Sequence, residues 1–410
     1  MMEHGMITLR IAFRNIFRQK RRTILTVLTM IVGFTLAAVS IGWSDGTYSY
    51  IINMFTRNRI GHVQIHHEGY LDEPSLYKTI DDYESVANVS EKVKGVETWS
   101  PRVESAGLAS VGEKSSGVRI MGVDPEREAK ATSFDKKIIS GNSLSAEPSY
   151  EAVVGKGLAE ILEADVGSEI VIISQGADGS IANDLYNIVG IADSGDDISD
   201  RSSCYLHIQD AQSFLVLEGR IHEIVLILSD LGEVNRVTGT LKKALRGRGL
   251  EVTPWQEVAR SFYQAMRADQ QGMWIMIFVV VLIVAVEVLN TVLMSVLERT
   301  REYGLLKAIG TRPNQLFRLV LYESFIIAAV SVVVGSALGT FANHLLSVYG
   351  ISLSEPFTYG GMEFQEIRSE VTAQSLYIPG ITVILSAVLV SVFPAAKAAR
   401  TASARAMRIH

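Results

Sequence analysis

Few residues in this sequence combine a reactive side chain with the spacing that chemistry would need. The pair Gly155-Lys156 is followed by Gly157. A phosphate-binding loop instead requires Ser or Thr directly after its lysine, because that hydroxyl contacts the Mg²⁺ of a bound nucleotide. The sequence therefore predicts no nucleotide site, and we expect neither a catalytic residue nor a cofactor in this chain.

A group of histidines is the arrangement that most invites a metal site. His62, His66 and His67 are followed directly by Glu68. Alternate residues of a strand point to the same face, so the side chains of His62 and His66 would lie on one face of the strand. The HExxH spacing of helical zinc sites is absent. We therefore expect no metal site.

One carboxylate, Glu287, stands inside a long apolar run, three residues before Asn290. An ionised carboxylate at the centre of a bilayer costs about 2.5–3.5 kcal/mol on insertion scales. Glu287 is therefore expected to be protonated or to have a polar partner. Two interpretations stay open. Either Glu287 contributes to a polar cavity or to a contact between two chains, or it is a neutral side chain that hydrogen-bonds to Asn290 or another helix.

Four apolar runs would position these groups. The chain has 410 residues, of which 48% are hydrophobic, and the runs cover residues 23–43, 273–297, 319–347 and 376–396. The first run is about 31 Å long at 1.5 Å per residue, enough to span the hydrocarbon core of a bilayer. We expect four transmembrane helices.

Charge predicts how these helices are oriented. Six basic residues precede the first run, five lie in 298–318 and four in 397–410. Residues 44–271 instead hold 22 basic and 35 acidic residues, a net charge of 22 − 35 = −13. Lys and Arg close to membrane spans remain in the cytoplasm. Both termini and the loop 298–318 are therefore predicted to be cytoplasmic, and residues 44–271 and 348–373 extracytoplasmic.

The segment 1–22 combines apolar residues with arginines at roughly helical spacing. It is predicted to be an amphipathic helix at the cytoplasmic interface, with its arginines near anionic lipid headgroups. The alternative is a positively charged flank that only sets the topology.

The segment 44–271 has the pattern of a folded α+β domain, of one or two lobes. Period-2 alternation predicts strands at 62–66, 108–111, 118–123, 169–174, 186–191 and 224–228. Helices are predicted at 80–93, 157–163 and 234–245. Cys204 is the single cysteine, so no intrachain disulfide can form.

A helix is predicted to lead from this domain into the second apolar run. Thr253, Pro254 and Gln256 fit an N-cap, a first-turn proline and a third-position glutamine. If this stalk continues to Tyr303, it is a rod of about 75 Å. Such a rod would carry movement between the outer domain and the cytoplasm.

Two cytoplasmic segments resemble a known family. Residues 289–324 read LNTVLMSVLERTREYGLLKAIGTRPNQLFRLVLYES, and residues 392–408 read VFPAAKAARTASARAMR. Both resemble the FtsX-like permeases, which include the lipoprotein-releasing (Lol) permeases and the macrolide exporter MacB. The string ERTREYGLLKAIG is the specific part. VVGKGLAEILEADVGSEIVIIS at 153–174 is similar, more loosely, to the MacB-like core domain. The resemblance covers essentially the whole chain and implies a four-helix permease with a large α+β extracytoplasmic domain between its first two spans.

In that family, the loop that matches 298–310 is a coupling helix that docks on a cytoplasmic ATPase. The resemblance carries this role to Glu298, Arg299, Glu302, Tyr303, Gly304, Lys307, Ala308 and Gly310. Without the resemblance, the segment would be read as a surface turn between two spans.

The resemblance also implies partners and a location. The partners are two copies of an ABC ATPase, which would bind ATP and Mg²⁺, and a second permease chain in a homodimer or a paralogous heterodimer. The lipid bilayer and a periplasmic lipoprotein carrier or adaptor complete the set, with no nucleic acid. The expected location is the bacterial inner membrane, with the large domain in the periplasm.

Three functions remain open within the family. GHVQIHHEGY at 61–70 favours lipoprotein release by a mechanotransmission permease. The alternatives are MacB-like export of drugs or peptides from the periplasm and FtsX-like signalling, without transport, to a murein hydrolase or sensor.

Overall fold

The computed structural model describes residues 12, 14, 20–359 and 362–400. The chain divides into two compact units. We call residues 1–49, 266–353 and 366–410 the helical unit, and residues 50–265 and 354–365 the sheet unit. Most of the predicted helix at 1–22 lies outside the described residues, as does most of the tail at 397–410.

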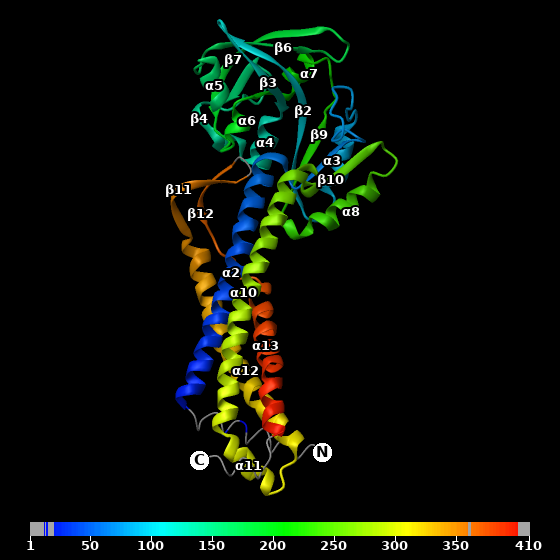
Figure 1. The fold of residues 1–410 in the computed structure, drawn as a ribbon. Helices are drawn as coiled ribbons and strands as arrows, with labels where there is room; N and C mark the ends of the chain where they lie inside the picture. The colour runs from blue at the N-terminus through cyan, green and yellow to red at the C-terminus, as the bar shows by residue number, and fades with distance from the viewer. Residues whose placement is uncertain (1–11, 13, 15–19, 360–361, 401–410) are drawn as a thin grey trace. The chain divides into compact units, whose positions relative to one another are not determined.

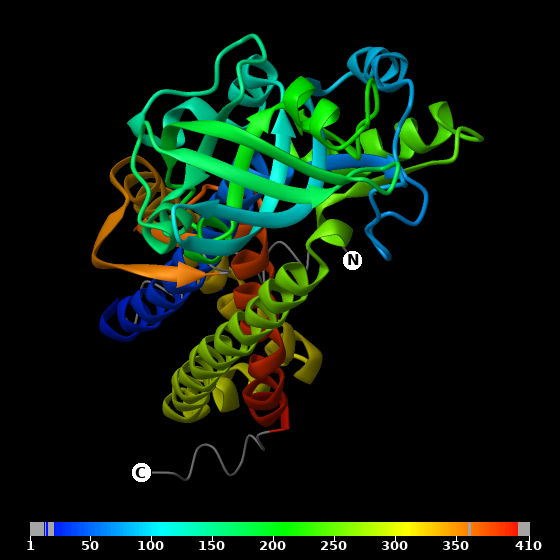
Figure 2. The same ribbon diagram turned by 90° about the horizontal axis from the view of Figure 1, so that it is seen from above.

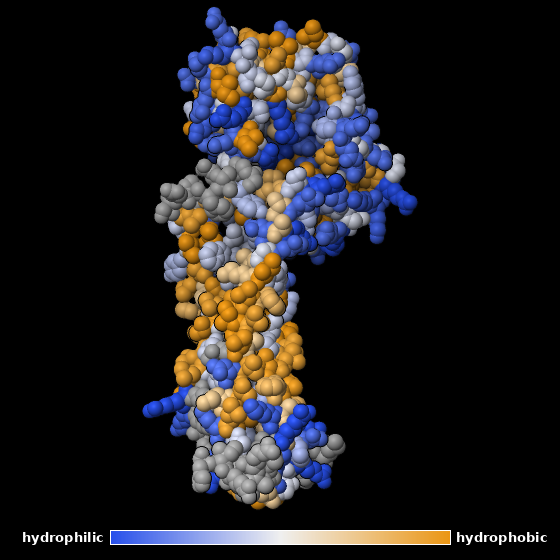
Figure 3. Space-filling model, in the orientation of Figure 1, coloured by the Kyte–Doolittle hydropathy of each residue, from blue (hydrophilic) through white to orange (hydrophobic). Residues whose placement is uncertain are grey.

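Long apolar helices dominate the helical unit (Figure 1). The four apolar runs lie in α2 (Lys20–Phe55), α10 (Arg260–Glu298), α12 (Pro313–Tyr349) and α13 (Gln374–Arg400). Over the described residues, these four helices are long and apolar enough to cross a membrane. Figure 3 shows hydrophobic side chains gathered over them. The short helix α11 (Thr300–Ala308) connects α10 to α12.

A stripe of small and polar residues holds α12 against α2. Its members recur every four positions and are all buried: Ser331, Gly335, Gly339 and Asn343. The Asn343 amide donates to the carbonyl of Ala38 at 3.0 Å. A Cβ atom at Gly335 would lie 2.8 Å from the ring of Phe34. Small residues allow this close approach of two helices, as is common in membrane proteins.

The predicted continuous rod from residue 254 to Tyr303 is wrong. Thr253 lies in strand β10 (Leu250–Pro254) and pairs with Gln64, so it is not a helix N-cap. One helical turn, α9 (Trp255–Val258), follows, and the helix breaks at Ala259, where φ is −103° and ψ is 50°. Helix α10 then has 39 residues, or about 58 Å. The pairing of β10 with the sheet overrides the local capping signal.

The segment 348–373, expected to be a loop, forms a hairpin of β11 (Ile351–Tyr359) and β12 (Met362–Ile367). The residues that follow the hairpin belong to the helical unit and form hydrogen bonds within it. The hydroxyl of Ser369 donates to the Asn343 side-chain oxygen at 3.0 Å, and that of Thr372 donates to the Asp45 carboxylate at 2.7 Å.

One ten-stranded sheet organises residues 50–265 of the sheet unit (Figure 2). The strand order is β10-β1-β9-β2-β3-β8-β5-β7-β4, and β6 pairs with β2 and β7. Besides β10, the strands are β1 (Val63–His67), β2 (Val96–Val111), β3 (Lys114–Val123), β4 (Ile138–Gly141), β5 (Glu151–Gly155), β6 (Glu169–Gln175), β7 (Ile181–Ala192), β8 (Ser203–His207) and β9 (Glu223–Leu228).

The π-helical turn η1 (Thr56–Ile60) connects α2 to β1. Short helices connect the other strands: α3 (Tyr83–Glu91), α4 (Pro125–Thr132), the 3₁₀ turn η2 (Phe134–Lys137), α5 (Lys156–Leu162), α6 (Asp197–Asp200), α7 (Ile208–Phe214), η3 (Leu231–Glu233) and α8 (Val234–Ala244). The expected α+β character of this segment is confirmed, and the predicted strands and the helices predicted at 80–93, 157–163 and 234–245 each overlap an observed element of their type. The first of these helices is shorter than predicted, and Ile80 instead forms a β-bridge with Ile221. Tight turns join neighbouring strands, as at Gly112, whose φ of 56° favours glycine.

Candidate functional site

Helix α11 is amphipathic, because residues four apart share one side of a helix. One set faces the other helices of the helical unit and consists of Arg299, just before the helix, Tyr303 and Lys307. The other set, Arg301, Leu305 and Ile309, is exposed. The segment ends at Gly310, whose φ of 102° suits glycine.

Arg299 connects α11 to α12. It is 8% exposed, and its guanidinium donates to both oxygens of Glu323 at 3.0 and 3.1 Å and to Glu302 at 3.1 Å. Burial alone would lower the pKa of Arg299, but the nearby Glu323 carboxylate has the opposite effect, and the pKa of Arg299 is raised overall. The guanidinium also lies 5.3 Å from the centre of the Tyr303 ring. The charge is therefore compensated, as a buried cation requires.

Tyr303, Gly304 and Lys307 complete the inward side. Tyr303 is 1% exposed, and no described residue forms a hydrogen bond with its hydroxyl. Burial raises the pKa of Tyr303. Gly304 is buried beside it. The Lys307 ammonium donates to the carbonyl of Ala399, near the end of α13, at 2.6 Å. Helix α11 is thus attached to both α12 and α13.

The outward side is apolar at its centre. Leu305 is 58% exposed and Ile309 is 73% exposed. Ala308 and Gly310 are exposed beside them, as is Glu298 before the helix. The site residues named from the sequence included Arg299, Tyr303, Gly304 and Lys307, which point inward, and omitted Arg301, Leu305 and Ile309. The four-residue spacing of both sets could have separated them.

The predicted role of Glu287 and Asn290 is not tested by the structure. The side chain of Glu287 lies outside what the structure describes, and Asn290 is exposed. The role of this pair stays a prediction.

His62 and His66 form hydrogen bonds to neighbouring groups of the sheet. His62 accepts from the Leu228 amide at 2.8 Å, and burial lowers the pKa of His62 to about 4. His66 contacts the Gln64 side chain at 2.9 Å. Across the described residues, no three His, Cys, Asp or Glu side chains are grouped so as to hold a metal ion.

Four long apolar helices and a large α+β unit define a multi-pass membrane protein. A family model described as the MacB-like periplasmic core domain matches residues 23–244, and one described as the FtsX-like permease C-terminal matches residues 274–402. The chain therefore belongs to the ABC transporter permease family of FtsX-like and MacB-like proteins. The resemblance seen in the sequence is confirmed.

Relatives align along most of the chain. It is 23% identical to the lipoprotein-releasing system transmembrane protein LolC of Neisseria meningitidis serogroup B, over 97% of this chain and 98% of that protein. It is 25% identical to an uncharacterized ABC transporter permease of Methanocaldococcus jannaschii, over 80% of this chain and 81% of that one. It is 21% identical to the macrolide export ATP-binding/permease protein MacB of Marinobacter nauticus, over 83% of this chain and 54% of that protein.

Two solved structures are similar at low TM-score. The periplasmic region of MacB from Actinobacillus actinomycetemcomitans has a TM-score of 0.38 and 16% identity, covering 51% of this chain and 94% of that one. The extracellular domain of the transporter YknZ from Gram-positive bacteria has a TM-score of 0.35 and 11% identity, covering 47% of this chain and 100% of that one.

Proposed function

We propose that this chain is the membrane subunit of an ABC transporter whose separate ATPase docks on the outward side of α11. The observation that carries the proposal is the division of α11 into an attached side and an exposed apolar side. Exposed apolar groups gathered on an anchored helix are typical of a protein interface. The residues proposed for docking are Glu298, Arg301, Leu305, Ala308, Ile309 and Gly310.

The attached side would transmit the movement. Because Arg299 holds α11 to Glu323 of α12, and Lys307 holds it to the end of α13, a displacement of α11 by the ATPase acts on two spans at once. Glu302, Tyr303 and Gly304 stabilise this attachment. ATP and Mg²⁺ would be bound by the ATPase, two copies of which would serve two permease chains.

The proposed topology follows the charge asymmetry. Both termini and α11 lie in the cytoplasm, and the sheet unit lies in the periplasm, on the other side of a bacterial inner membrane. Residues 44–271, with 22 basic and 35 acidic residues, include nearly all of the sheet unit.

We propose lipoprotein release from the inner membrane as the process that this transporter carries out. The alignment with LolC extends over nearly the full length of both proteins, which supports this choice. A periplasmic lipoprotein carrier would then be a partner. Export of drugs or peptides is the second candidate, supported by the match of residues 23–244 to the MacB-like core domain.

Substitution of Leu305 tests the docking role. Leu305→Asp places a charge in the centre of the exposed apolar side, so we expect about tenfold less ATPase to copurify with the permease. The control is Ile198→Asp, which places the same charge at a 77% exposed isoleucine of the sheet unit. Unchanged copurification of the ATPase with Leu305→Asp would contradict docking on this face.

Reconstituted vesicles that contain the permease and its ATPase distinguish the two substrate classes. ATP-dependent transfer of a triacylated lipoprotein to an added periplasmic carrier is expected for lipoprotein release. ATP-dependent movement of a macrolide, with no lipoprotein transfer, would favour export instead.

A further inference from the structure

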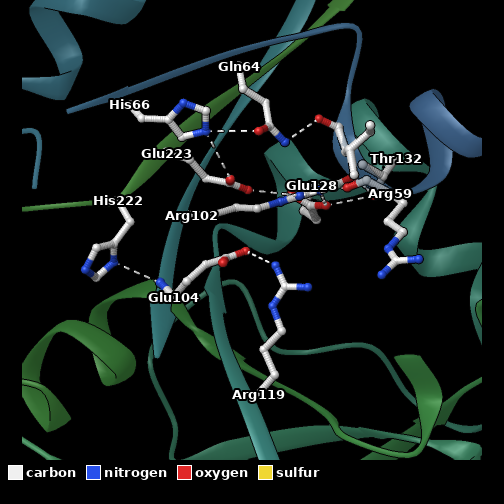
Figure 4. A network of polar contacts seen from close by, with 11 residues as sticks. Arg59, Gln64, His66, Arg102, Glu104, Arg119, Glu128, Thr132, His222 and Glu223 are labelled. Carbon is white, nitrogen blue, oxygen red and sulfur yellow. Dashed lines mark hydrogen bonds and ion pairs between the residues drawn. The ribbon is translucent and has the colours of Figure 1, made fainter. Parts of the chain in front are cut away.

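Charged side chains lie side by side on one face of the sheet. In the strand ladder, His66 of β1 is the partner of Glu223 in β9, and Glu223 is the partner of Arg102 in β2. Glu104, two residues after Arg102, lies on the same face and forms an ion pair with Arg119 of β3 (Figure 4). Buried charges are costly unless they are paired, so this row needs an explanation.

Arg102 is at the centre of the deep part of the row. Arg102 is 4% exposed and donates to Glu128 at 2.6 and 3.2 Å, to Glu223 at 3.2 Å and to the carbonyl of Arg59 at 2.7 Å. Burial alone would raise the pKa of Glu223, but His66 and Arg102 hold it down, at about 2. This part is structural, because it ties β2 to α4 and to η1.

The outer part has unused hydrogen-bonding capacity. Among the described residues, Arg119 donates to Glu104 alone, and its side chain is 45% exposed. The Tyr70 hydroxyl forms no hydrogen bond with any described residue, although the ring stacks near His66 and His222 at 5.5 and 5.7 Å. The Arg119 guanidinium and the Tyr70 hydroxyl therefore both have free hydrogen-bonding capacity, and both line the same cavity as Glu104.

The ionised forms of two nearby groups are disfavoured there. Burial and the charge of Glu223 raise the pKa of Glu104, and burial lowers the pKa of Lys137 to about 8. A bound molecule with complementary charges would favour both ionised forms. Shifted pKa values of this kind cluster at binding and catalytic sites.

These groups line a cavity of about 190 Å³. A 150 Å³ cavity in another protein holds benzene, so there is room for a small organic molecule. Glu104, Arg119 and Tyr70 provide a polar part of the lining, and Leu71, Met121 and Phe134 provide an apolar part.

We propose that this cavity binds a small zwitterion of the α-amino acid class with an apolar side chain. The ammonium group would pair with Glu104, the carboxylate with Arg119 and the Tyr70 hydroxyl, and the side chain would contact Met121 and Phe134. The Glu104–Arg119 pair is neutral overall. A ligand with a single charge would therefore satisfy one partner and leave the other uncompensated, whereas a zwitterion satisfies both.

Residues of the two segments that lead to membrane helices also line the cavity. Arg59 and Ile60 belong to η1, which directly follows α2, and Val258 belongs to α9, which precedes α10. Occupancy of the cavity would therefore change the contacts of both segments and, through them, the ATPase rate. This last step rests on the proposed function, whereas binding itself does not.

Calorimetry on the full-length chain in lipid nanodiscs tests binding. The probes are L-leucine, 4-methylpentanoate, which lacks the ammonium group, and 3-methylbutylamine, which lacks the carboxylate. L-leucine is expected to bind at least about tenfold more tightly than either analogue. The absence of L-leucine binding, or equal binding of L-leucine and one analogue, would overturn the proposal.

Variants locate the ligand in the cavity. Glu104→Gln and Arg119→Gln should each weaken L-leucine binding by about tenfold or more. Lys114→Gln, which removes an exposed ion pair with Glu163 from the same strand as Arg119, should leave binding unchanged. The thermal unfolding midpoint of each variant shows whether it is folded. A folded Arg119→Gln chain that binds L-leucine as tightly as the parent would refute the placement.

The ATPase assay separates binding from regulation. If L-leucine binds and alters the ATPase rate of the reconstituted complex, both steps are supported. If L-leucine binds and the rate is unaltered, the cavity is a ligand site and the link to the ATPase is wrong.

Discussion

At the scale of single residues, Arg299 matters most for the proposed coupling. It lies between α10 and α11, where its backbone N–H donates to the carbonyl of Ser295 in α10 and its guanidinium donates to Glu302 of α11 and Glu323 of α12. Its partner Glu323 lies 24 positions away in the sequence. Removing one member of a buried ion pair is costly, about 3–5 kcal/mol, because the remaining charge stays in the low-dielectric interior.

Arg299→Gln is therefore expected to lower the unfolding midpoint of the purified chain by several degrees. The double variant Arg299→Gln/Glu323→Gln should recover part of the loss, since it removes both charges. The control is Arg368→Gln, because Arg368 and Glu366 form a pair that is 51% and 46% exposed, and such pairs contribute about 0–1 kcal/mol. Equal midpoints for Arg299→Gln and Arg368→Gln, measured by scanning fluorimetry, would contradict this role of Arg299.

At the scale of elements, the α2–α12 contact depends on glycine. Gly335→Leu should push α12 away from Phe34 of α2, because a Cβ atom alone would lie 2.8 Å from that ring. Inserting bulk into a packed contact costs about 1–3 kcal/mol. Ala337→Leu adds comparable bulk at an exposed position of the same helix and is the matched control. A lower unfolding midpoint for Gly335→Leu than for Ala337→Leu is expected, and equal midpoints would rule out this seam.

Local patterns predicted the type of most elements but not the contacts that decide their limits. The apolar runs and the alternating strands were recognisable because their periodicity is local. Thr253-Pro254 had a helix-start signal, yet its backbone pairs with β1, nearly 190 residues earlier in the chain. The four-residue spacing in the sequence could have separated the two sides of α11. The sequence could not show which side is attached to the other helices, because the attachment depends on contacts with Glu323 and Ala399. Likewise, Arg102, Glu128 and Glu223 gave no signal in the sequence, since only the sheet brings them together.

At the scale of the whole molecule, a modest net charge of −6 hides a strong separation of charge. The segments around α11 and at the chain ends are basic, while residues 44–271 have a net charge of −13 from 22 basic and 35 acidic residues. Retention of Lys and Arg in the cytoplasm is a topological effect, so it orients all four spans together. A cytoplasmic ATPase can dock on α11 only in the orientation that places α11 in the cytoplasm.

Cysteine labelling in intact cells tests this orientation. Cys204 is fully buried, and Cys204→Ala removes it as a background site. In that background, Glu113→Cys in the β2–β3 turn should react with a membrane-impermeant maleimide in spheroplasts. Asn314→Cys, exposed at the start of α12, should react only after permeabilisation. If Asn314→Cys reacts in intact spheroplasts, α11 faces away from the cytoplasm. A cytoplasmic ATPase could not then reach Leu305, and the proposed coupling would fail as a whole.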